Sequence, residues 1–303
     1  MPVPESHQIP RVTSLDPEKT FDLFVRNLRR LSYFERRVAL WDGKTPKLRR
    51  FLYKFRALDC ANDVSVDRMR DLIVRSRFWL SSPLDFNDPF DGRGKFIAES
   101  SARQKRERLK SLLKRQGLKF AAREKLLALL ARKSNDVYEE LVREFYQSHL
   151  QKLGICSFGG DPRSILMWSH YSNHHTGAWL QFESARDPVI FTRVVPMKYS
   201  EGYPVVNWIN DFDEGLQILM ERKHVGWKYE HESRLHIMDA ASSYLQFEPE
   251  ALRGICFGCR SSDQTIKKVR ELIAERINNG SSHPKLYEAK QDDSSYKLSI
   301  HKL

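Results

Sequence analysis

Residues 78–91 read FWLSSPLDFNDPFD, the most specific stretch of this chain. The residues at 78–81 are mostly aromatic or aliphatic and predict a short strand. Asn, Asp and Pro at 87–89 then predict a tight turn, because all three favour turn conformations. Phe86 and Phe90 bracket this turn, and buried aromatic side chains hold a loop in one shape. We therefore expect a rigid, specific loop that directly follows a strand.

Hydrophobic periodicity on both sides of this stretch predicts an α+β fold. Before it, residues 52–55 predict a strand and residues 66–74 a helix. After it, the chain predicts strands at 154–158, 178–182, 189–195, 233–238, 245–247, 255–257 and 297–300, with helices at 209–222 and 263–277. We expect a mixed, mostly antiparallel sheet core with flanking helices.

Two segments lie outside this core pattern. Residues 1–15 are rich in proline and polar residues and predict a disordered lead-in. An amphipathic helix is expected from residue 16, and residues 16–303 are expected to form a single α+β domain. A helical insertion at about 98–150 interrupts it, with a pattern that indicates two helical stretches.

The positive charge of the chain is concentrated in this insertion. The net charge is +12, and residues 101–133 hold 12 lysines and arginines against two glutamates, a local charge of +10. Such a localised basic element favours a polyanionic partner, RNA or DNA. The alternative is a solvated helix face without a partner. The candidate nucleic-acid-binding residues are Arg103, Arg106, Lys110, Lys114, Arg115 and Lys119.

Composition argues against several classes of protein. No run of about 18 apolar residues occurs, which argues against a membrane span. The first residues lack the basic and apolar regions of a signal peptide. Four cysteines in 303 residues do not make a disulfide framework. We therefore expect a cytoplasmic protein with no membrane partner.

Glu230 and Glu232 form the first candidate catalytic pair. In an extended chain, residues i and i+2 point the same way, so the two carboxylates would share one face about 6–7 Å apart. That arrangement suits gripping a ribose while stabilising a developing oxocarbenium ion. The alternative is that one of the glutamates pairs with Arg234, which lies on the same face.

Four segments resemble a bacterial family catalogued as domain of unknown function 2971. They are residues 52–56, 78–91, 166–171 and 227–230, and the resemblance extends over residues 50–300. This family has no settled activity, so the resemblance implies a relationship without a reaction.

The order of polar residues is also similar to the ADP-ribosyltransferase superfamily signature, in which Arg, Ser-x-Ser and Glu-x-Glu follow one another. The resemblance implies that Arg56 holds the phosphates of NAD and that the Ser81-Ser82 segment braces the cleft. It implies Glu232 as the catalytic carboxylate, with Glu230 orienting the acceptor. Tyr53 is an alternative ligand from the first strand. NAD would be the substrate, and no metal is expected.

A second constellation comprises Trp168, His170 and Tyr171. An indole, an imidazole and a phenol together can stack on and hydrogen-bond a nucleotide base. These side chains can equally cap a hydrophobic core, and Trp168 is expected to pack. His170 and His174 would share a face if a helix continued that far. Gly177 is expected to let the next strand approach closely.

Two further groups of residues are weaker candidates. Cys256 and Cys259 form a single Cys-x-x-Cys without a second pair, which favours buried small residues at a strand-to-helix turn, although their role stays open. Asp85, Asp88 and Asp91 could hold the divalent ions of a nuclease. Turn and capping roles explain these aspartates better.

These patterns support three functional hypotheses. The leading one is an ADP-ribosyltransferase-like, NAD-consuming enzyme of bacterial defence or toxin type that modifies a nucleic acid or a protein bound to one. The alternative is a non-enzymatic nucleic-acid-binding module, and a metal-dependent nuclease is third. The sequence leaves open the acceptor, the oligomeric state, toxicity, and whether Arg56, Ser81 and Glu232 meet in space.

Overall fold

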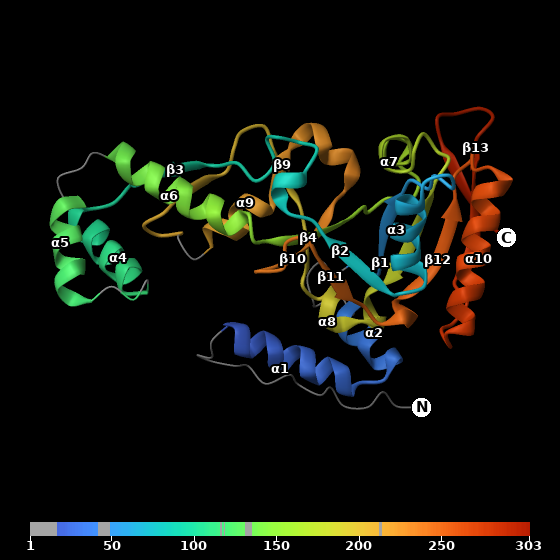
Figure 1. The fold of residues 1–303 in the computed structure, drawn as a ribbon, viewed down its shortest axis with the longest axis horizontal. Helices are drawn as coiled ribbons and strands as arrows, with labels where there is room; N and C mark the ends of the chain where they lie inside the picture. Colours follow the sequence, from blue (N-terminus) through green and yellow to red (C-terminus); the bar gives the residue numbers. More distant parts are fainter. Residues whose placement is uncertain (1–16, 42–48, 116, 118, 131–134, 212–213) are drawn as a thin grey trace.

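A computed structural model describes residues 17–41, 49–115, 117, 119–130, 135–211 and 214–303. The predicted lead-in, residues 1–15, lies outside the described residues. The described chain is α+β, with a mixed and mostly antiparallel main sheet, which confirms the predicted fold class (Figure 1). No helix among the described residues is long and apolar enough to cross a lipid bilayer.

The main sheet has five strands. Its spatial order is β1 (Phe51–Arg56), β5 (Ala178–Glu183), β12 (Leu252–Phe257), β13 (Lys285–Gln291) and β14 (Leu298–Lys302). Within this sheet, the β12–β13 pair is parallel and the other pairs are antiparallel. Helices α3 (Asp63–Ile73) and α10 (Asp263–Asn278) contribute Met69, Leu72, Val269 and Leu272 to the core beside this sheet.

Strand β4 (Gly154–Phe158) joins the main sheet to the smaller ones. It lies in a three-stranded sheet with β10 (Ser233–Ile237) and β6 (Val194–Pro196). An isolated bridge from Tyr53 to Gly159, directly after β4, connects this sheet to β1. A second bridge joins Ser81 to Ile155 and so connects β4 to the end of β2. Strand β4 therefore contacts the end of β2 near its own start and β1 just after its own end.

Two further pairs and several helices complete this part of the chain. The pairs are β2 (Arg77–Leu80) with β11 (Ser243–Gln246) and β7 (Lys198–Ser200) with β9 (Arg222–His224). The other α-helices here are α1 (Pro17–Arg30), α2 (Tyr33–Trp41), α7 (Ile165–Tyr171), α8 (Pro188–Phe191) and α9 (Gly215–Met220). Short 3₁₀ helices lie at η1 (Pro83–Asp85), η2 (Ser184–Arg186), η3 (Val225–Glu230) and η4 (Pro249–Ala251).

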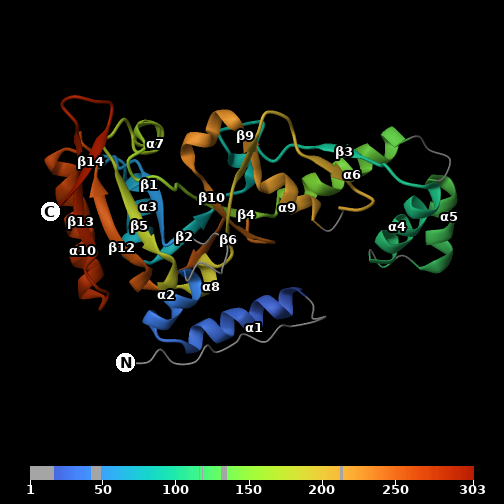
Figure 2. The same cartoon turned by 180° about the vertical axis from the view of Figure 1, so that it is seen from behind.

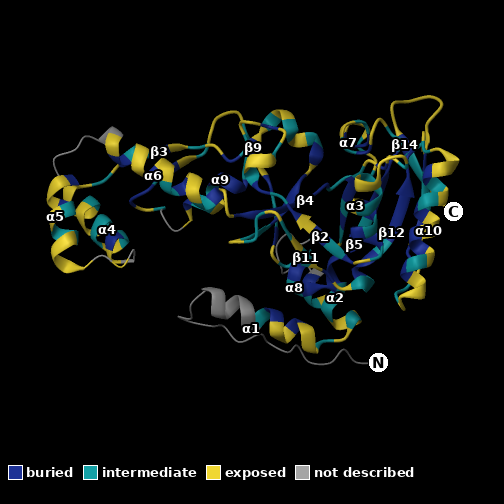
Figure 3. Ribbon diagram, in the orientation of Figure 1, coloured by how far each residue is buried: buried dark blue, intermediate teal, exposed yellow. Residues whose placement is uncertain are grey.

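The helices of the basic region project away from the main sheet as an arm (Figures 1 and 2). They are α4 (Ala102–Arg115), α5 (Phe120–Leu130) and α6 (Asn135–Leu150), so the two predicted helical stretches are three helices. Strands β3 (Lys95–Ile97) and β8 (Val205–Asn207) pair at the base of the arm. A separate apolar cluster that includes Tyr146 and Trp208 stabilises it. Figure 3 shows that most residues of α4 and α5 are exposed or half-buried.

The loop at residues 82–91 is anchored by its own polar side chains. The Ser82 hydroxyl accepts the Leu84 N–H at 3.3 Å, and Asp88 Oδ1 accepts the Phe90 N–H at 2.9 Å. Phe86 is half-buried and packs beneath the Arg234 guanidinium, 5.0 Å from its ring centroid. Phe90 is 62% exposed, so the expectation that both aromatics are buried is wrong for Phe90.

Other local predictions also need correction. The strand predicted at 189–195 is helix α8 followed by β6, because Asp187 caps the helix through the Ile190 N–H and Pro188 occupies its first turn. The helix predicted at 209–222 is only the short α9. Strand β13 was not predicted, since Lys285, Glu288 and Lys290 interrupt its apolar pattern.

Candidate functional site

A cavity of about 460 Å³ is lined by residues of β1, β4 and α7, by the end of β2, and by residues of η3 and the start of β10. Its lining brings together most of the predicted site residues, although they are far apart in the chain. These are Tyr53, Arg56, Ser81, His170, Tyr171, Glu230 and Glu232. Its volume falls within the range of about 300–1,000 Å³ that is usual for ligand pockets.

Two predicted cofactor-binding residues do not line this cavity. The Ser82 side chain is 7% exposed and caps the short helix at Pro83–Asp85. Trp168 is fully buried, and its indole N–H donates to the Pro162 carbonyl at 2.9 Å. Phe55 packs edge-on against its ring. Trp168 therefore belongs to the core, as its packing alternative predicted, and its assignment to the cofactor site is wrong.

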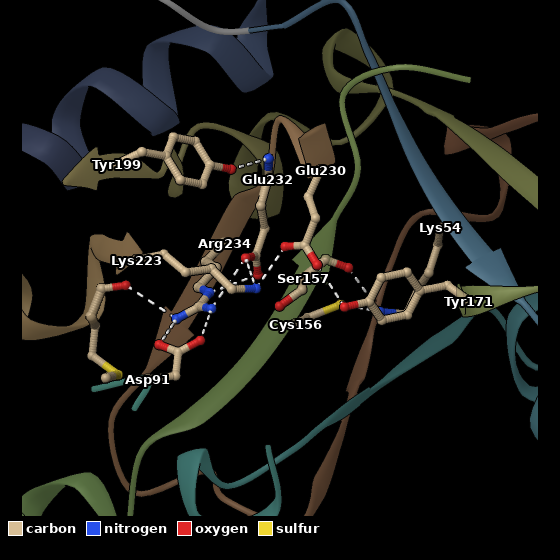
Figure 4. Close-up of polar contacts among 11 residues, drawn as sticks. Lys54, Asp91, Cys156, Ser157, Tyr171, Tyr199, Lys223, Glu230, Glu232 and Arg234 are labelled. Atoms are coloured by element: carbon tan, nitrogen blue, oxygen red, sulfur yellow. Dashed lines mark hydrogen bonds and ion pairs between the residues drawn. The ribbon is translucent and has the colours of Figure 1, made fainter. Parts of the chain in front are cut away.

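Arg234 is the centre of a buried ionic network beside the cavity (Figure 4). Its Nη1 and Nη2 contact the two Asp91 carboxylate oxygens at 2.9 and 2.5 Å. Its Nε and Nη2 contact the two Glu232 oxygens at 2.7 and 3.1 Å. The predicted alternative, a pair between a glutamate and Arg234, is therefore present for Glu232.

Lys223 links Glu232 to Glu230. Its Nζ lies 2.6 Å from Glu230 Oε2 and 3.1 Å from Glu232 Oε2, and all three side chains are buried. Strand pairing places Lys223 opposite Tyr199, whose hydroxyl accepts the Glu232 N–H at 2.9 Å. No sequence pattern singled out Lys223, because its position depends on the β7–β9 pair.

The backbone between the two glutamates is not extended. Glu230 ends η3, His231 has a left-handed φ of 44°, and β10 begins only at Ser233. The prediction that strand alternation aligns the carboxylates is therefore wrong. They instead converge on the Lys223 ammonium, which attracts both.

The environments of the two carboxylates push their pKa values in opposite directions. Burial raises the pKa of Glu230, and the Lys223 charge only partly opposes it. Burial would also raise the pKa of Glu232, but the charges of Arg234 and Lys223 outweigh it and lower that pKa. Carboxylates separated in this way are typical of sites that assign them different roles.

Glu230 keeps more capacity to bind a ligand than Glu232. Each of its oxygens has one strong donor, the Tyr171 hydroxyl at 2.5 Å on Oε1 and Lys223 on Oε2. A carboxylate oxygen accepts about two hydrogen bonds, so each retains one acceptor position. Glu232 instead has both oxygens on the Arg234 guanidinium and a further contact to Lys223.

Strand β1 contributes two cations to the cavity. Lys54 donates to the Ser157 carbonyl at 3.0 Å and to Cys156 Sγ at 3.3 Å, and burial lowers its pKa. The buried Arg56 Nε has no hydrogen-bond partner among the described residues. Neither side chain has a carboxylate partner in the described part of the chain. Lys54 and Arg56 are two residues apart on β1, so their side chains leave the same face of the strand. This spacing could have identified Lys54 as a candidate together with Arg56.

Aromatic side chains flank these charges. His170 Nδ1 lies 3.0 Å from the Tyr229 hydroxyl, and Tyr171 contacts Glu230 as described above. Helix α7 ends at Tyr171, and His174 has a positive φ of 53°, so the possible shared face of His170 and His174 does not form. Gly177 confirms its predicted role, since a Cβ there would lie 2.1 Å from the Arg56 carbonyl oxygen.

The aspartates of the nuclease hypothesis have other partners. Asp88 caps the Phe90 N–H, Asp91 binds Arg234, and Asp85 is exposed. Among the described residues, no three His, Cys, Asp or Glu side chains are grouped to hold a metal ion. Cys256 is buried and Cys259 half-buried, and burial raises the pKa of both thiols.

The predicted nucleic-acid-binding residues lie on the arm, away from the cavity (Figure 1). Arg103, Lys114 and Lys119 are exposed, and Lys110 is half-buried. Arg106 is exposed and pairs with Glu124 at 3.0 Å. Arg115 ends α4, and its side chain lies outside the described residues.

His236 lies on β10, two residues after Arg234, and we expect it to make the stability of the fold sensitive to acid. Burial, followed by the charge of Arg234, lowers its pKa to about 4 from 6.5. The unfolded chain therefore binds a proton more readily between these values, and stability is lost as the pH falls from about 6.5 to 4. We expect His236→Asn to remove about 2 kcal/mol of this loss. Urea unfolding at several pH values tests this, and an unchanged pH profile would contradict it.

Comparison with family models, curated proteins and solved structures found no match for the chain. The resemblances to domain of unknown function 2971 and to the ADP-ribosyltransferases therefore remain predictions.

Proposed function

We propose that the chain is an ADP-ribosyltransferase-like enzyme of bacterial defence or toxin type that consumes NAD. Its target would be a nucleic acid or a protein bound to one. One observation carries the proposal. Arg56, Ser81 and the glutamate pair, taken from three distant segments in the order of that superfamily's signature, line one cavity.

The charges of the cavity fit a dinucleotide. Lys54 and Arg56 supply positive charge without a carboxylate partner among the described residues, which favours the pyrophosphate. Tyr53, His170 and Tyr171 line the cavity, and aromatic rings of this kind can stack on a base or on nicotinamide. In this arrangement Arg56 positions the phosphates and Ser81 lies at the wall formed by β2.

Glu230 is the proposed catalytic carboxylate. Cleavage breaks the bond between the ribose C1′ and the nicotinamide nitrogen, nicotinamide leaves with the electron pair, and positive charge develops on the ribose. A carboxylate with a remaining acceptor position can bind a ribose hydroxyl and stabilise that charge. Glu232 would then hold Lys223 and Arg234 in place, which reverses the roles expected from the signature alone.

Nicotinamide release from labelled NAD tests the proposal. We expect Arg56→Ala to lower kcat/KM by about 10- to 100-fold, mainly through KM, because a charge-assisted bond contributes about 1.5–3 kcal/mol. Its buried Nε has no hydrogen-bond partner among the described residues. Thermal unfolding of the variant separates a loss of binding from a loss of packing. Arg270→Ala, on the exposed side of α10, is the matched control. No release by the wild-type protein, with or without nucleic acid, would overturn the proposal.

A second candidate, a nucleic-acid-binding module without catalysis, is favoured by the arm. Most of the net charge lies in residues 101–133, and Arg103, Lys114 and Lys119 are exposed there. This candidate predicts nucleic-acid binding that weakens steeply as the salt concentration rises and that does not require NAD.

A further inference from the structure

A second cavity, of about 610 Å³, lies at the base of the arm. The loop at 87–90 forms one wall, and residues 200–204 and 222–224 with Trp227 form the others. Asn87 and Lys223 line both cavities, so the two adjoin. Phe90 does not pack into the core as expected, and its exposed ring lines this second cavity.

The lining of the second cavity combines exposed rings with cations. Phe90 is 62% and Tyr203 48% exposed, so both rings present area on which a base can stack. The Arg93 guanidinium lies 5.9 Å from the Phe90 ring centroid. Trp227 is half-buried, with Lys223 Nζ 4.7 Å from its ring centroid. Stacking on aromatic rings is how proteins bind unpaired bases, because every base has a π face.

Two arginines in the lining of the second cavity can bind a phosphate, because the acidic side chains nearby contact other groups. Arg93 and Arg222 line the cavity, and neither forms an ion pair within the part of the chain that the structure describes. Of the acidic lining residues, Asp88 accepts the Phe90 N–H and Glu201 lies 3.5 Å from His224. The exposed Asn87 adds an amide that can bond a base edge.

The arm continues directly from this cavity. Strand β3 begins two residues after Arg93, and β8 begins two residues after Tyr203, so the paired strands lead from the cavity into the arm. Within the described residues, the arm carries ten of the 12 lysines and arginines of the basic segment at 101–133. A strand whose phosphates contact α4 can therefore extend to the cavity.

We propose that the second cavity binds an unpaired nucleotide of a single-stranded nucleic acid whose backbone follows the basic arm. RNA and DNA both present a flat base next to a phosphate, and these are the two groups that the cavity would bind. This inference rests on the nucleic-acid-binding candidate and is independent of NAD cleavage. A duplex cannot enter in this way, because its bases are stacked on one another.

Fluorescence anisotropy with the full chain tests this inference. The probes are labelled single strands of about 12 nucleotides, in RNA and DNA forms, and a duplex of the same sequence. We expect the single strands to bind at least about tenfold more tightly than the duplex. The double variant Phe90→Ala/Tyr203→Ala should weaken single-strand binding by at least about tenfold and leave duplex binding unchanged. Tyr296→Ala, which removes a 99% exposed ring elsewhere, should change neither.

A variant of the arm separates nucleic-acid binding by the arm from base stacking in the second cavity. Arg103→Glu/Lys114→Glu should weaken single strands and duplex alike, because phosphate contacts carry no preference for unpaired bases. If the arm variant weakens binding while the Phe90/Tyr203 variant binds like the wild type, the stacking site is overturned and the nucleic-acid function stands. If neither probe binds the wild-type protein, both are overturned. Thermal unfolding of each variant verifies that the fold is intact.

Discussion

Replacing Arg234 with methionine is expected to lower the free energy of unfolding by about 3–5 kcal/mol. Arg234 is 1% exposed and neutralises Asp91 and Glu232, whose side chains are also buried. Methionine fills a similar volume but leaves both carboxylates in a medium that penalises charge, with only Lys223 near Glu232. Urea denaturation at neutral pH measures the loss.

A double-mutant cycle identifies the cause of this loss. Asp91→Asn combined with Arg234→Met should recover part of the stability, because one uncompensated charge is removed. Arg270→Met, at an exposed position on α10, is the control and should change stability by less than about 0.5 kcal/mol. A loss of under about 1 kcal/mol in Arg234→Met would show that the network contributes little to folding.

Changing Glu230 to glutamine is expected to have the largest effect on activity. If the proposed chemistry is right, the rate of nicotinamide release should fall by about 10²–10³-fold in kcat, as for other groups that stabilise transition-state charge. The amide keeps the shape of the side chain, but when its oxygen accepts the Tyr171 hydroxyl its NH2 group faces Lys223. Thermal unfolding therefore has to show that the variant is folded. Steady-state kinetics with labelled NAD measure the effect, and KM should change little.

Two comparisons sharpen this result. Glu271→Gln, on the surface of α10, should leave kcat unchanged. Glu232→Gln should lower stability, because it removes the charge that faces Arg234 and Lys223. Full nicotinamide release by the Glu230 variant, with loss of release in a folded Glu232 variant, would return the catalytic role to Glu232.

The sequence predicted much of the framework around the site. Strand and helix patterns located β1, α3, β2, β4, β5, β10, β12, β14 and α10, because these elements have clear apolar periods and end signals. The order of Arg56, Ser81 and the glutamate pair suggested a common site, and these residues do line one cavity. Gly177 was also predicted correctly, since a close approach leaves glycine as the residue that fits.

Other features could not be read from local patterns. Trp168 looks like a pocket residue in sequence, but whether an indole faces a cavity or the core depends on which strand packs against it, here through Phe55. Lys54 carries no signal of burial, because lysine on a strand is usually exposed. Phe90 looks like a core residue, yet the capped turn directs it outward.

The amino-acid sequence by itself determined the α+β class, the position of the basic insertion and the residue types available for chemistry. These follow from local periodicity and composition, which need no knowledge of distant contacts. Only the tertiary structure decided that Lys223 joins Glu230 to Glu232 and that Arg234 neutralises one of them and not the other. Burial and charge proximity set the properties of such groups, and both depend on segments that are far apart along the chain.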